Sequence, residues 1–281
     1  MFPTSRQLGL AALTALAGLR SVEAQFDFNW KSIKPSPDLV WHDCYEVQKC
    51  ARLEVPMDWV AAENGTDDGR TIAIAMVKLP AVVPTNDTTY GGPIFWNPGG
   101  PGGSGVVGQI GTGAYIQSRI DKPDERHYDI ISFDPRGVGV TTPAVNCYPK
   151  DPINRDLRNL ESVPSFRRRS GYFESFPYTL ALSRAFGQRC EGQEVLPYVG
   201  TPSVARDMVA MIDAIARASG RTNTEEDVPR LQYIGFSYGT YIGNVFASLF
   251  PGRVGRLVLD GVVDAYDHTS GPVSSPSCFP H

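Results

Sequence analysis

The sequence predicts an α/β fold, in which a mostly parallel, doubly wound sheet carries helices on both faces. Short runs rich in β-branched and aromatic residues recur along the chain without clean polar alternation, as expected for strands covered on both sides. Helical patterns separate the later runs, and this alternation is typical of parallel sheets. The predicted strands lie at residues 72–79, 93–97, 128–133, 231–235 and 256–259.

Two helices are predicted near the fourth of these strands. Ser203 can cap the first helix, which should end at Gly220. A second helix is predicted over residues 238–249, ended by Pro251. The apolar face of the first helix comprises Val204, Met208, Ile212 and Ile215.

The size and composition fit one large domain. The chain has 281 residues, of which 42% are hydrophobic and 20% charged, so it can bury a substantial core. The formal net charge of −4 indicates no polyanionic partner such as nucleic acid. We predict a domain over residues 25–267, interrupted at about 143–197 by a Pro- and Arg-rich insertion, and an atypical tail at 268–281. The run Arg167–Arg169 in the insertion is interpreted as a solvated face.

The N-terminus predicts a secretory signal peptide over residues 1–24. Arg6 precedes an apolar run from Leu8 to Leu19, and Val22–Ala24 supplies the small-residue cleavage pattern. No other stretch is long and apolar enough to cross a bilayer. We therefore expect a secreted, extracellular protein without membrane association after cleavage.

The cysteines and two sequons agree with export. Five cysteines suit an oxidising compartment. One pair could close a small loop and another could link the ends of the insertion, although spacing alone leaves other pairings open. Asn64 and Asn86 begin glycosylation sequons in polar segments. The disulfide candidates are Cys44 with Cys50 and Cys147 with Cys190, which leaves Cys278 over.

The strongest chemical motif is the G-x-S-x-G pattern that runs from Gly235 through Ser237 to Gly239. It lies between a predicted strand and a predicted helix. A sharp strand-to-helix turn holds such a serine in a strained conformation, and the flanking glycines give it room. The hydroxyl is then exposed at the positive end of the helix. The pattern predicts that Ser237 is a catalytic nucleophile.

A glycine-rich segment, residues 97–105, follows an earlier strand and could complete the site. Acyl transfer needs N–H donors where negative charge develops on the substrate oxygen. One donor is expected from the backbone of Tyr238, the residue after the nucleophile, and the other from Gly99 or Gly100. This segment is our candidate for the oxyanion loop.

The same segment permits a rival interpretation as a dinucleotide-binding fingerprint, because Gly100, Gly102 and Gly105 fit G-x-G-x-x-G. Pro101 removes an N–H that a phosphate would need. The acidic residue expected about twenty positions on would fall near Asp121, which does not follow a strand. We therefore favour the hydrolase interpretation and expect no cofactor. No Cys/His cluster has metal-ligand spacing, so no metal is expected either.

Four ordered motifs together resemble the tripeptidyl-aminopeptidase and proline-iminopeptidase group of α/β-hydrolases, the secreted tripeptidyl-aminopeptidase-like branch in particular. The resemblance runs from about Trp41 to Asp267, and Pro98 stands where iminopeptidases usually carry histidine. It implies an exopeptidase that releases short peptides or residues from free N-termini, and its relatives also hydrolyse esters. The motifs are Pro98–Gly103, Asp134–Gly139, Gly235–Thr240 and Leu259–Asp264.

The remaining members of a catalytic triad are not evident. In this fold the acid and then the histidine follow the serine, and only His268 and His281 do so. We interpret neither as the base, and we interpret His42 and His127 as surface or core residues. The group places its acid one strand later than Asp260, so Asp260 is interpreted as structural. We expect a chain truncated after the strand that follows the nucleophile turn, equivalent to the N-terminal half of the enzyme.

Asp134 and Arg136, in the second motif, are interpreted as a structural ion pair or turn rather than as catalytic groups. Two functional alternatives remain open. One is a lipase- or carboxylesterase-like hydrolase acting on small esters instead of peptides. The other is an inactive secreted binding module that lacks the triad acid and base.

Overall fold

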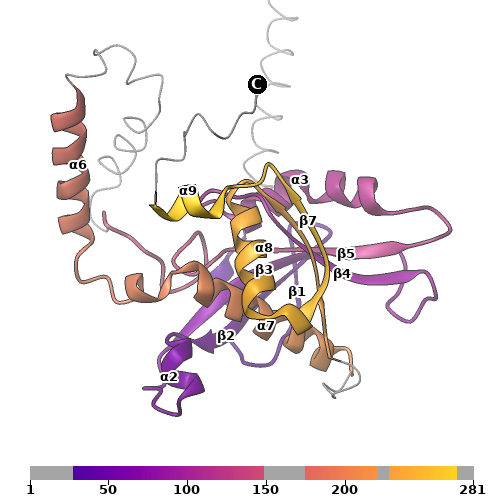
Figure 1. The fold of residues 1–281 in the computed structure, drawn as a ribbon. Coiled ribbons are helices and arrows are strands. Elements are labelled where there is room, and N and C mark those ends of the chain that lie inside the picture. The colour runs from indigo at the N-terminus through magenta and orange to yellow at the C-terminus, as the bar shows by residue number, and fades with distance from the viewer. Residues whose placement is uncertain (1–27, 149–174, 221–227, 271–281) are drawn as a thin grey trace, which may run out of the picture. The chain divides into compact units, whose positions relative to one another are not determined.

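The computed structural model describes residues 28–148, 175–220 and 228–270 (Figure 1). These residues belong to two compact units, one formed by residues 1–143 with 198–281 and the other by 144–197. The predicted signal peptide, the arginine run, the tail after residue 270, His281 and Cys278 lie outside the described residues. No described helix has the length and apolar character needed to span a membrane.

The first unit is built on a seven-stranded mixed sheet with the order β1-β2-β3-β5-β4-β6-β7. Strands β5, β4, β6 and β7 run parallel to one another, and β1, β2, β3 and β5 pair antiparallel in turn. The strands are β1 (His42–Cys44), β2 (Gln48–Pro56), β3 (Thr71–Leu79), β4 (Tyr90–Asn97), β5 (His127–Phe133), β6 (Leu231–Phe236) and β7 (Val254–Asp260).

Helices cover both faces of the sheet, which confirms the predicted fold class. The helices are α2 (Trp59–Glu63), α3 (Gly105–Ile120), α7 (Thr201–Ala218), α8 (Tyr238–Leu249) and α9 (Ala265–Ser270), with 3₁₀ turns η1 (Trp30–Ser32) and η3 (Pro251–Arg253). Gly108 of α3 packs on Trp96, whereas Gly243 of α8 packs on Tyr233. Trp96 is paired with Ile234, the neighbour of Tyr233, so the two helices lie on opposite faces.

The chain reverses direction across the sheet at β4. From β4 the chain crosses through α3 to β5 on one side and returns through α7 to β6 on the other. In open α/β sheets ligands bind at the carboxyl ends of the strands at such a switch point. The carboxyl ends of β4 and β6 carry Asn97 and Ser237, so the topology itself brings the two glycine motifs together.

The later strands and α8 follow the sequence closely, with small extensions. The N-cap of α7 is a correction, because the cap is Gly200 and Ser203 lies inside the first turn. Pro202 explains the earlier start, since a proline is pre-organised for the first helical turn and needs no partner for its missing N–H. Gly220 follows the end of α7 with φ of +73°, as expected of a residue that terminates a helix.

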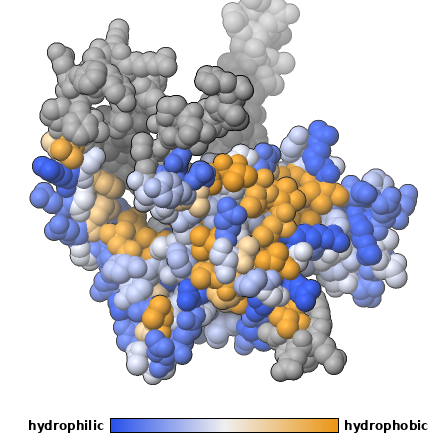
Figure 2. Space-filling view, in the orientation of Figure 1, coloured by the Kyte–Doolittle hydropathy of each residue, from blue (hydrophilic) through white to orange (hydrophobic). Residues whose placement is uncertain are grey.

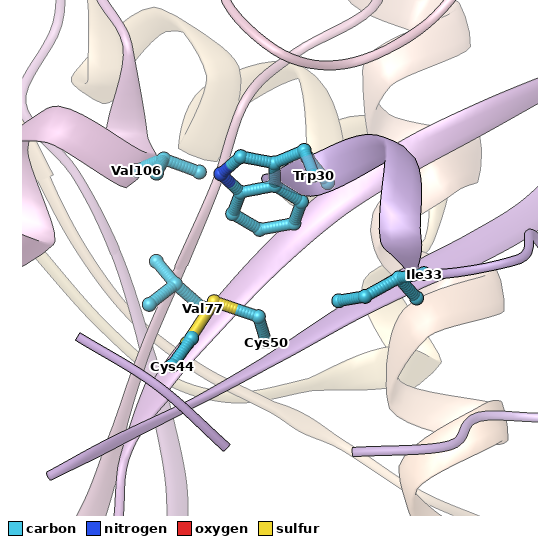
Figure 3. Close-up of a cluster of buried hydrophobic side chains, with 7 residues drawn as sticks. Trp30, Ile33, Cys44, Cys50, Val77 and Val106 are labelled. Atoms are coloured by element: carbon cyan, nitrogen blue, oxygen red, sulfur yellow. A yellow bond between two sulfur atoms is a disulfide. The ribbon is translucent and has the colours of Figure 1, made fainter. Parts of the chain in front are cut away.

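Strands β1 and β2 were not predicted, although β2 carries a clear period-two signal. Cys50, Leu53 and Val55 are buried, while Arg52 and Glu54 are partly exposed. The short hairpin that joins β1 to β2 is closed by the Cys44–Cys50 disulfide. This disulfide lies in an apolar cluster with Trp30, Ile33, Ala75, Val77 and Val106 (Figure 3).

The second unit is described only in part. It contains α6 (Ser175–Cys190) and most of the 3₁₀ turn η2 (Leu196–Tyr198). The second predicted disulfide is also present, because Cys147 is bonded to Cys190 over a sequence separation of 43 residues. The proposed pairing of all four candidate cysteines is therefore found in the structure.

Candidate active site at the carboxyl ends of β4 and β6

Ser237 is the single residue between β6 and α8, and it has φ of 52° and ψ of −123°. This conformation is unfavourable for a residue with a side chain, and such strain persists only where the surroundings impose it. The residue is exposed, at the N-terminus of α8. Its hydroxyl therefore stands above the carboxyl edge of the sheet, where the partial positive charge of the helix end lies.

The glycines on either side of Ser237 are required by close backbone approaches. A Cβ atom at Gly235 would lie 2.5 Å from the carbonyl oxygen of Gly239. A Cβ atom at Gly239 would lie 2.8 Å from the carbonyl oxygen of Asn97. The tight turn therefore excludes larger residues at both positions, which explains the G-x-S-x-G pattern in physical terms.

Hydrogen bonds from three segments hold the turn in place. The N–H of Ser237 donates to the carbonyl oxygen of Asp260 at the end of β7, at 3.1 Å. The carbonyl oxygen of Ser237 accepts from the hydroxyl of Thr240 at 2.7 Å and from the N–H of Thr240 at 2.9 Å. The Thr240 hydroxyl oxygen in turn accepts from the N–H of Val263 at 2.9 Å. The bonds to Asp260 and from Val263 thus tie the strained turn to the segment at the end of β7.

The glycine-rich loop packs directly onto this turn. Gly99 has φ of +100°, and a Cβ atom there would lie 2.9 Å from Cβ of Ser237 and 3.2 Å from the backbone nitrogen of Tyr238. Gly100 has φ of +134°, a value that side-chain-bearing residues rarely adopt. The structure therefore brings together the two segments that the sequence assigned to one site.

The backbone donors at this junction are not equivalent. The N–H of Gly99 donates to Oδ1 of Asn97 at 2.9 Å, so it is not available to a substrate oxygen. Among the described residues, no acceptor is bonded to the N–H of Gly100 or Tyr238. Of the two loop candidates for an oxyanion donor, the geometry thus favours Gly100. Gly99 instead allows the loop backbone to pack closely against Ser237.

The Tyr238 side chain is partly buried beside the turn. Its hydroxyl is hydrogen-bonded to Oγ1 of Thr201 at 2.6 Å, and its ring lies near the rings of Tyr241 and His268, with centroids 5.9 and 5.6 Å away. Burial raises the pKa of Tyr238. The phenol therefore stays neutral at physiological pH, as part of an aromatic group next to the nucleophile.

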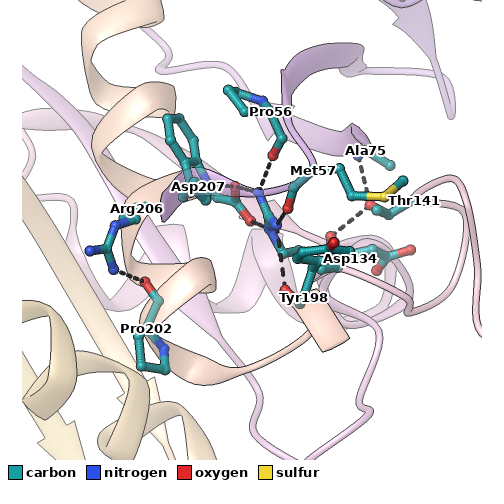
Figure 4. Close-up of polar contacts among 11 residues, drawn as sticks. Pro56, Met57, Ala75, Asp134, Thr141, Tyr198, Pro202, Arg206 and Asp207 are labelled. Atoms are coloured by element: carbon teal, nitrogen blue, oxygen red, sulfur yellow. Dashed lines mark hydrogen bonds and ion pairs between the residues drawn. The ribbon is translucent and has the colours of Figure 1, made fainter. Parts of the chain in front are cut away.

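Asp134 and Arg136 are buried, but they do not pair with each other. Arg136 forms a bidentate ion pair with Asp207 of α7, at 2.5 and 2.7 Å, and donates to the carbonyl oxygens of Met57, Pro56 and Tyr198 (Figure 4). The Trp59 indole also donates to Asp207 at 2.8 Å. This saturated network joins β2, the segment after β5 and α7, so the predicted structural role of Arg136 agrees with its contacts.

The histidines do not complete a catalytic triad within the described residues, because no histidine there is hydrogen-bonded to Ser237. His42 is exposed on β1, and Nδ1 of His127 lies 3.0 Å from the carboxylate of Asp121 at the end of α3. His268 is half-buried in α9, against the ring of Tyr241 at a centroid distance of 4.8 Å. Its ring also lies near that of Tyr238, the residue after the nucleophile.

Other candidate features lie away from this junction. An open cavity of about 870 Å³, lined by Tyr90, Gln232 and Arg256, lies at the amino ends of the parallel strands. Asn64 and Asn86 are exposed, as glycosylation would require. The described residues contain no group of three His, Cys, Asp or Glu side chains that could hold a metal ion.

Asn97 and Thr240 lie inside the predicted motifs, but sequence reasoning gave neither of them a role in the site. Asn97 is 1% exposed, and its side-chain oxygen fixes Gly99. A polar residue at the last position of an apolar strand, just before a glycine-rich turn, is the signal that could have found Asn97. Thr240 directly follows the G-x-S-x-G pattern, where a hydroxyl can bond back to the carbonyl group three positions earlier.

Comparisons with known proteins agree with this geometry. A family model described as the α/β-hydrolase fold matches residues 92–274. The serine protease Hip1 of Mycobacterium tuberculosis (strain CDC 1551 / Oshkosh) is 35% identical over 218 residues, which cover 76% of this chain and 36% of that protein. The tripeptidyl aminopeptidase of Streptomyces coelicolor is 31% identical over 232 residues, covering 80% and 38%. The carboxylesterase B of M. tuberculosis is 30% identical over 188 residues, covering 62% and 32%. The chain thus spans about a third of the length of these relatives.

Proposed function

Because the chain belongs to the α/β-hydrolase fold family, we propose that it carries the nucleophile and oxyanion loop of a secreted serine exopeptidase. One observation carries the proposal. Ser237 occupies a strained, exposed turn between β6 and α8, directly against the backbone of Gly99. Relatives named as a serine protease and a tripeptidyl aminopeptidase support peptide substrates.

In the proposed reaction the Ser237 hydroxyl attacks the scissile carbonyl carbon and gives up its proton to a general base. The carbonyl oxygen becomes an oxyanion, which the N–H groups of Tyr238 and Gly100 stabilise by hydrogen bonds. The C–N bond then breaks, the protonated base gives its proton to the leaving amine, and an acyl-enzyme remains. Water, deprotonated by the same base, attacks the acyl carbon and regenerates the serine as the C–O bond breaks. Both donors are backbone groups in a braced turn, so they need little reorganisation when the charge develops.

The base and its acid partner are not among the described residues that contact Ser237. Without a base a serine hydroxyl is a weak nucleophile. We propose that the complete enzyme supplies both groups, as expected from the fold's order of serine, acid and histidine. Asp260 contributes its backbone carbonyl to the turn, so we propose a structural role for it.

Export to an extracellular location is part of the same proposal. The sequence of residues 1–24 supports it, as do the two disulfides and the exposed sequons at Asn64 and Asn86. Mass spectrometry of the protein secreted by its native host would test it. A mature N-terminus at Gln25 and sugars on either asparagine are the expected results.

An ester hydrolase is the second candidate, favoured by the similarity to a carboxylesterase. Paired assays of the full-length gene product on peptide and p-nitrophenyl ester substrates separate the two. A peptidase should release N-terminal peptides much faster than it cleaves esters, with both activities lost in Ser237→Ala. Hydrolysis of esters alone would favour the second candidate.

An inactive binding module is the third candidate, because no described histidine reaches Ser237. A fluorophosphonate probe labels only an activated serine. We expect labelling of the full-length gene product, which supplies the base, and we expect it to be lost in Ser237→Ala. Absence of labelling in both this chain and an extended version would reject the enzyme proposal.

A further inference from the structure

The carboxylate of Asp134 lies just past the end of β5, fully buried, and accepts hydrogen bonds mainly from one end of the glycine-rich loop. Its Oδ1 atom accepts from Oγ of Ser104 at 2.6 Å and from the N–H of Val106 at 3.0 Å. Its Oδ2 atom accepts from the N–H of Val140 at 2.8 Å. The group therefore binds the start of α3 to the turn after β5.

The backbone of Asp134 is fixed on the side of β3. Its N–H donates to the carbonyl oxygen of Ala75 at 3.0 Å, and its carbonyl oxygen accepts from the hydroxyl of Thr141 at 2.7 Å. Thr141 itself accepts from the N–H of Ala75 at 2.9 Å. The carboxylate is thus held in place by buried strands, and it can transmit that rigidity to the loop.

The opposite end of the loop has its own anchor. Oδ1 of Asn97, at the end of β4, accepts from the N–H of Gly99. Residues 98–104 are therefore clamped at one end by an amide and at the other by a carboxylate, from adjacent strands. Between these clamps the loop presents Gly99 to Cβ of Ser237 and leaves the N–H of Gly100 without an acceptor among the described residues.

We propose that Asp134 is a positioning residue that fixes the glycine-rich loop so that the Gly100 N–H meets the developing oxyanion. This inference rests on the proposed function and deepens it. An oxyanion donor must lie about 2.7–3.1 Å from the oxygen, so a loop shift of about 1 Å weakens the bond. The glycines of the loop have no side chains to hold it, and the clamps supply the missing constraint.

The contacts of Asp134 are separate from the buried ion pair of Arg136. Arg136, two residues later, is bound to Asp207 in a different network, so Asp134 is not an ion-pair partner of that arginine. A buried carboxylate without a paired cation is costly to keep. Burial accordingly raises the pKa of Asp134, although the hydrogen bonds from Ser104, Val140 and Val106 oppose this shift.

Asp134→Asn in the full-length gene product, which supplies the base for Ser237, tests the proposal. Asparagine keeps the size of the side chain, but its NH₂ group would face the N–H of Val140 or displace the bonds to Ser104 and Val106. Asp121→Asn is the matched control, because Asp121 caps the opposite end of the same helix and accepts from the N–H of Tyr128. Both variants are compared with the wild type at a temperature where circular dichroism shows all three folded.

The first measurement is the rate of labelling of Ser237 by a fluorophosphonate. Removing one oxyanion donor costs about 10²–10³ in rate, so a displaced donor should slow labelling by about tenfold or more in Asp134→Asn. Asp121→Asn should label at the wild-type rate. Equal labelling of wild type and Asp134→Asn, or equal slowing in the two variants, would overturn the proposal.

The second measurement is hydrogen exchange of the peptide that covers residues 98–107, which needs no activity. Exchange should be faster in Asp134→Asn than in Asp121→Asn, while the β3 peptide is unchanged in both. An unchanged loop would overturn the positioning role. If the wild type does not label but the loop exchanges faster in Asp134→Asn, the clamp stands and the proposed function fails.

Discussion

Strands β5 and β7 belong to the same sheet, but their environments are opposite. Six of the seven residues of β5 are buried, between β3 and β4 and beneath α3. Strand β7 lies at the edge of the sheet and has no fully buried residue, and Val258 is 57% exposed. Figure 2 shows apolar side chains gathered over this part of the molecule. Ser237 lies between the two regions, so one side of the site rests on a packed core and the other on an open edge.

The difference teaches where the rigidity of the site originates. The glycine-rich loop is held by Asn97 and Asp134, at the ends of buried strands. The nucleophile turn is held on its other side by the backbone bond to Asp260, at the end of the edge strand, and by the bond from Val263 to Thr240 just beyond it. Substitutions on the β5 side should therefore affect stability far more than equivalent substitutions on β7.

The largest effect is expected at the buried ion pair beside β5. Arg136→Met leaves the Asp207 carboxylate buried without its cation, which should lower the free energy of unfolding by about 3–5 kcal/mol. Urea unfolding followed by circular dichroism measures this change. Lys122→Met removes one partner of an exposed pair with Glu125 and should leave the unfolding midpoint almost unchanged. Similar losses in both variants would contradict the comparison.

A matched pair of core and edge truncations gives the next largest effect. Ile130→Ala on β5 should destabilise the protein by about 2–5 kcal/mol, because the side chain is fully buried and its removal leaves a cavity. Val258→Ala on β7 should change stability by no more than about 0.5 kcal/mol. The same denaturant experiment compares them, and a large loss in Val258→Ala would show that the edge is covered in solution.

The nucleophile turn provides a smaller effect of opposite sign. Ser237→Gly relieves the positive φ angle and should raise the free energy of unfolding by about 1 kcal/mol while abolishing fluorophosphonate labelling. Ser237→Ala also abolishes labelling, but it keeps the strained conformation and should gain little. Thermal unfolding of both variants would refute the assignment of strain if their midpoints were the same.

The smallest change in stability is expected for a charge on the open edge. Val258→Lys should leave the unfolding midpoint within about 0.5 kcal/mol of the wild type, because the side chain is already largely in water. It should nevertheless reduce aggregation, since charged residues on edge strands oppose pairing between molecules. Light scattering at increasing protein concentration measures this. Unchanged aggregation would show that the molecules do not associate through β7.

Much of the fold could be predicted because the later strands and helices have strong local signals. The run Leu231–Phe236 is mostly apolar, the following turn needs glycine twice, and α8 begins at once. The hairpin of β1 and β2 was missed although β2 alternates, because β1 has only three residues and the turn places Tyr45 and Glu46 at positive φ without the usual glycine or asparagine. The start of α7 was placed too late. Capping preferences favour Ser203 as the cap, but Pro202 fits the first helical turn, and the helix begins before it.

The sequence by itself determined the strand–turn–helix motif around Ser237, the glycine-rich segment and the disulfide candidates, because each depends on residues close together in the chain. The tertiary structure alone decided that Asn97 occupies the N–H of Gly99, that Arg136 pairs with Asp207 rather than Asp134, and that Asp134 holds the loop. These partners lie on different elements, and their distances are fixed only when the strands take their places in the sheet. Local patterns specify conformations, whereas the order of strands specifies which polar groups meet.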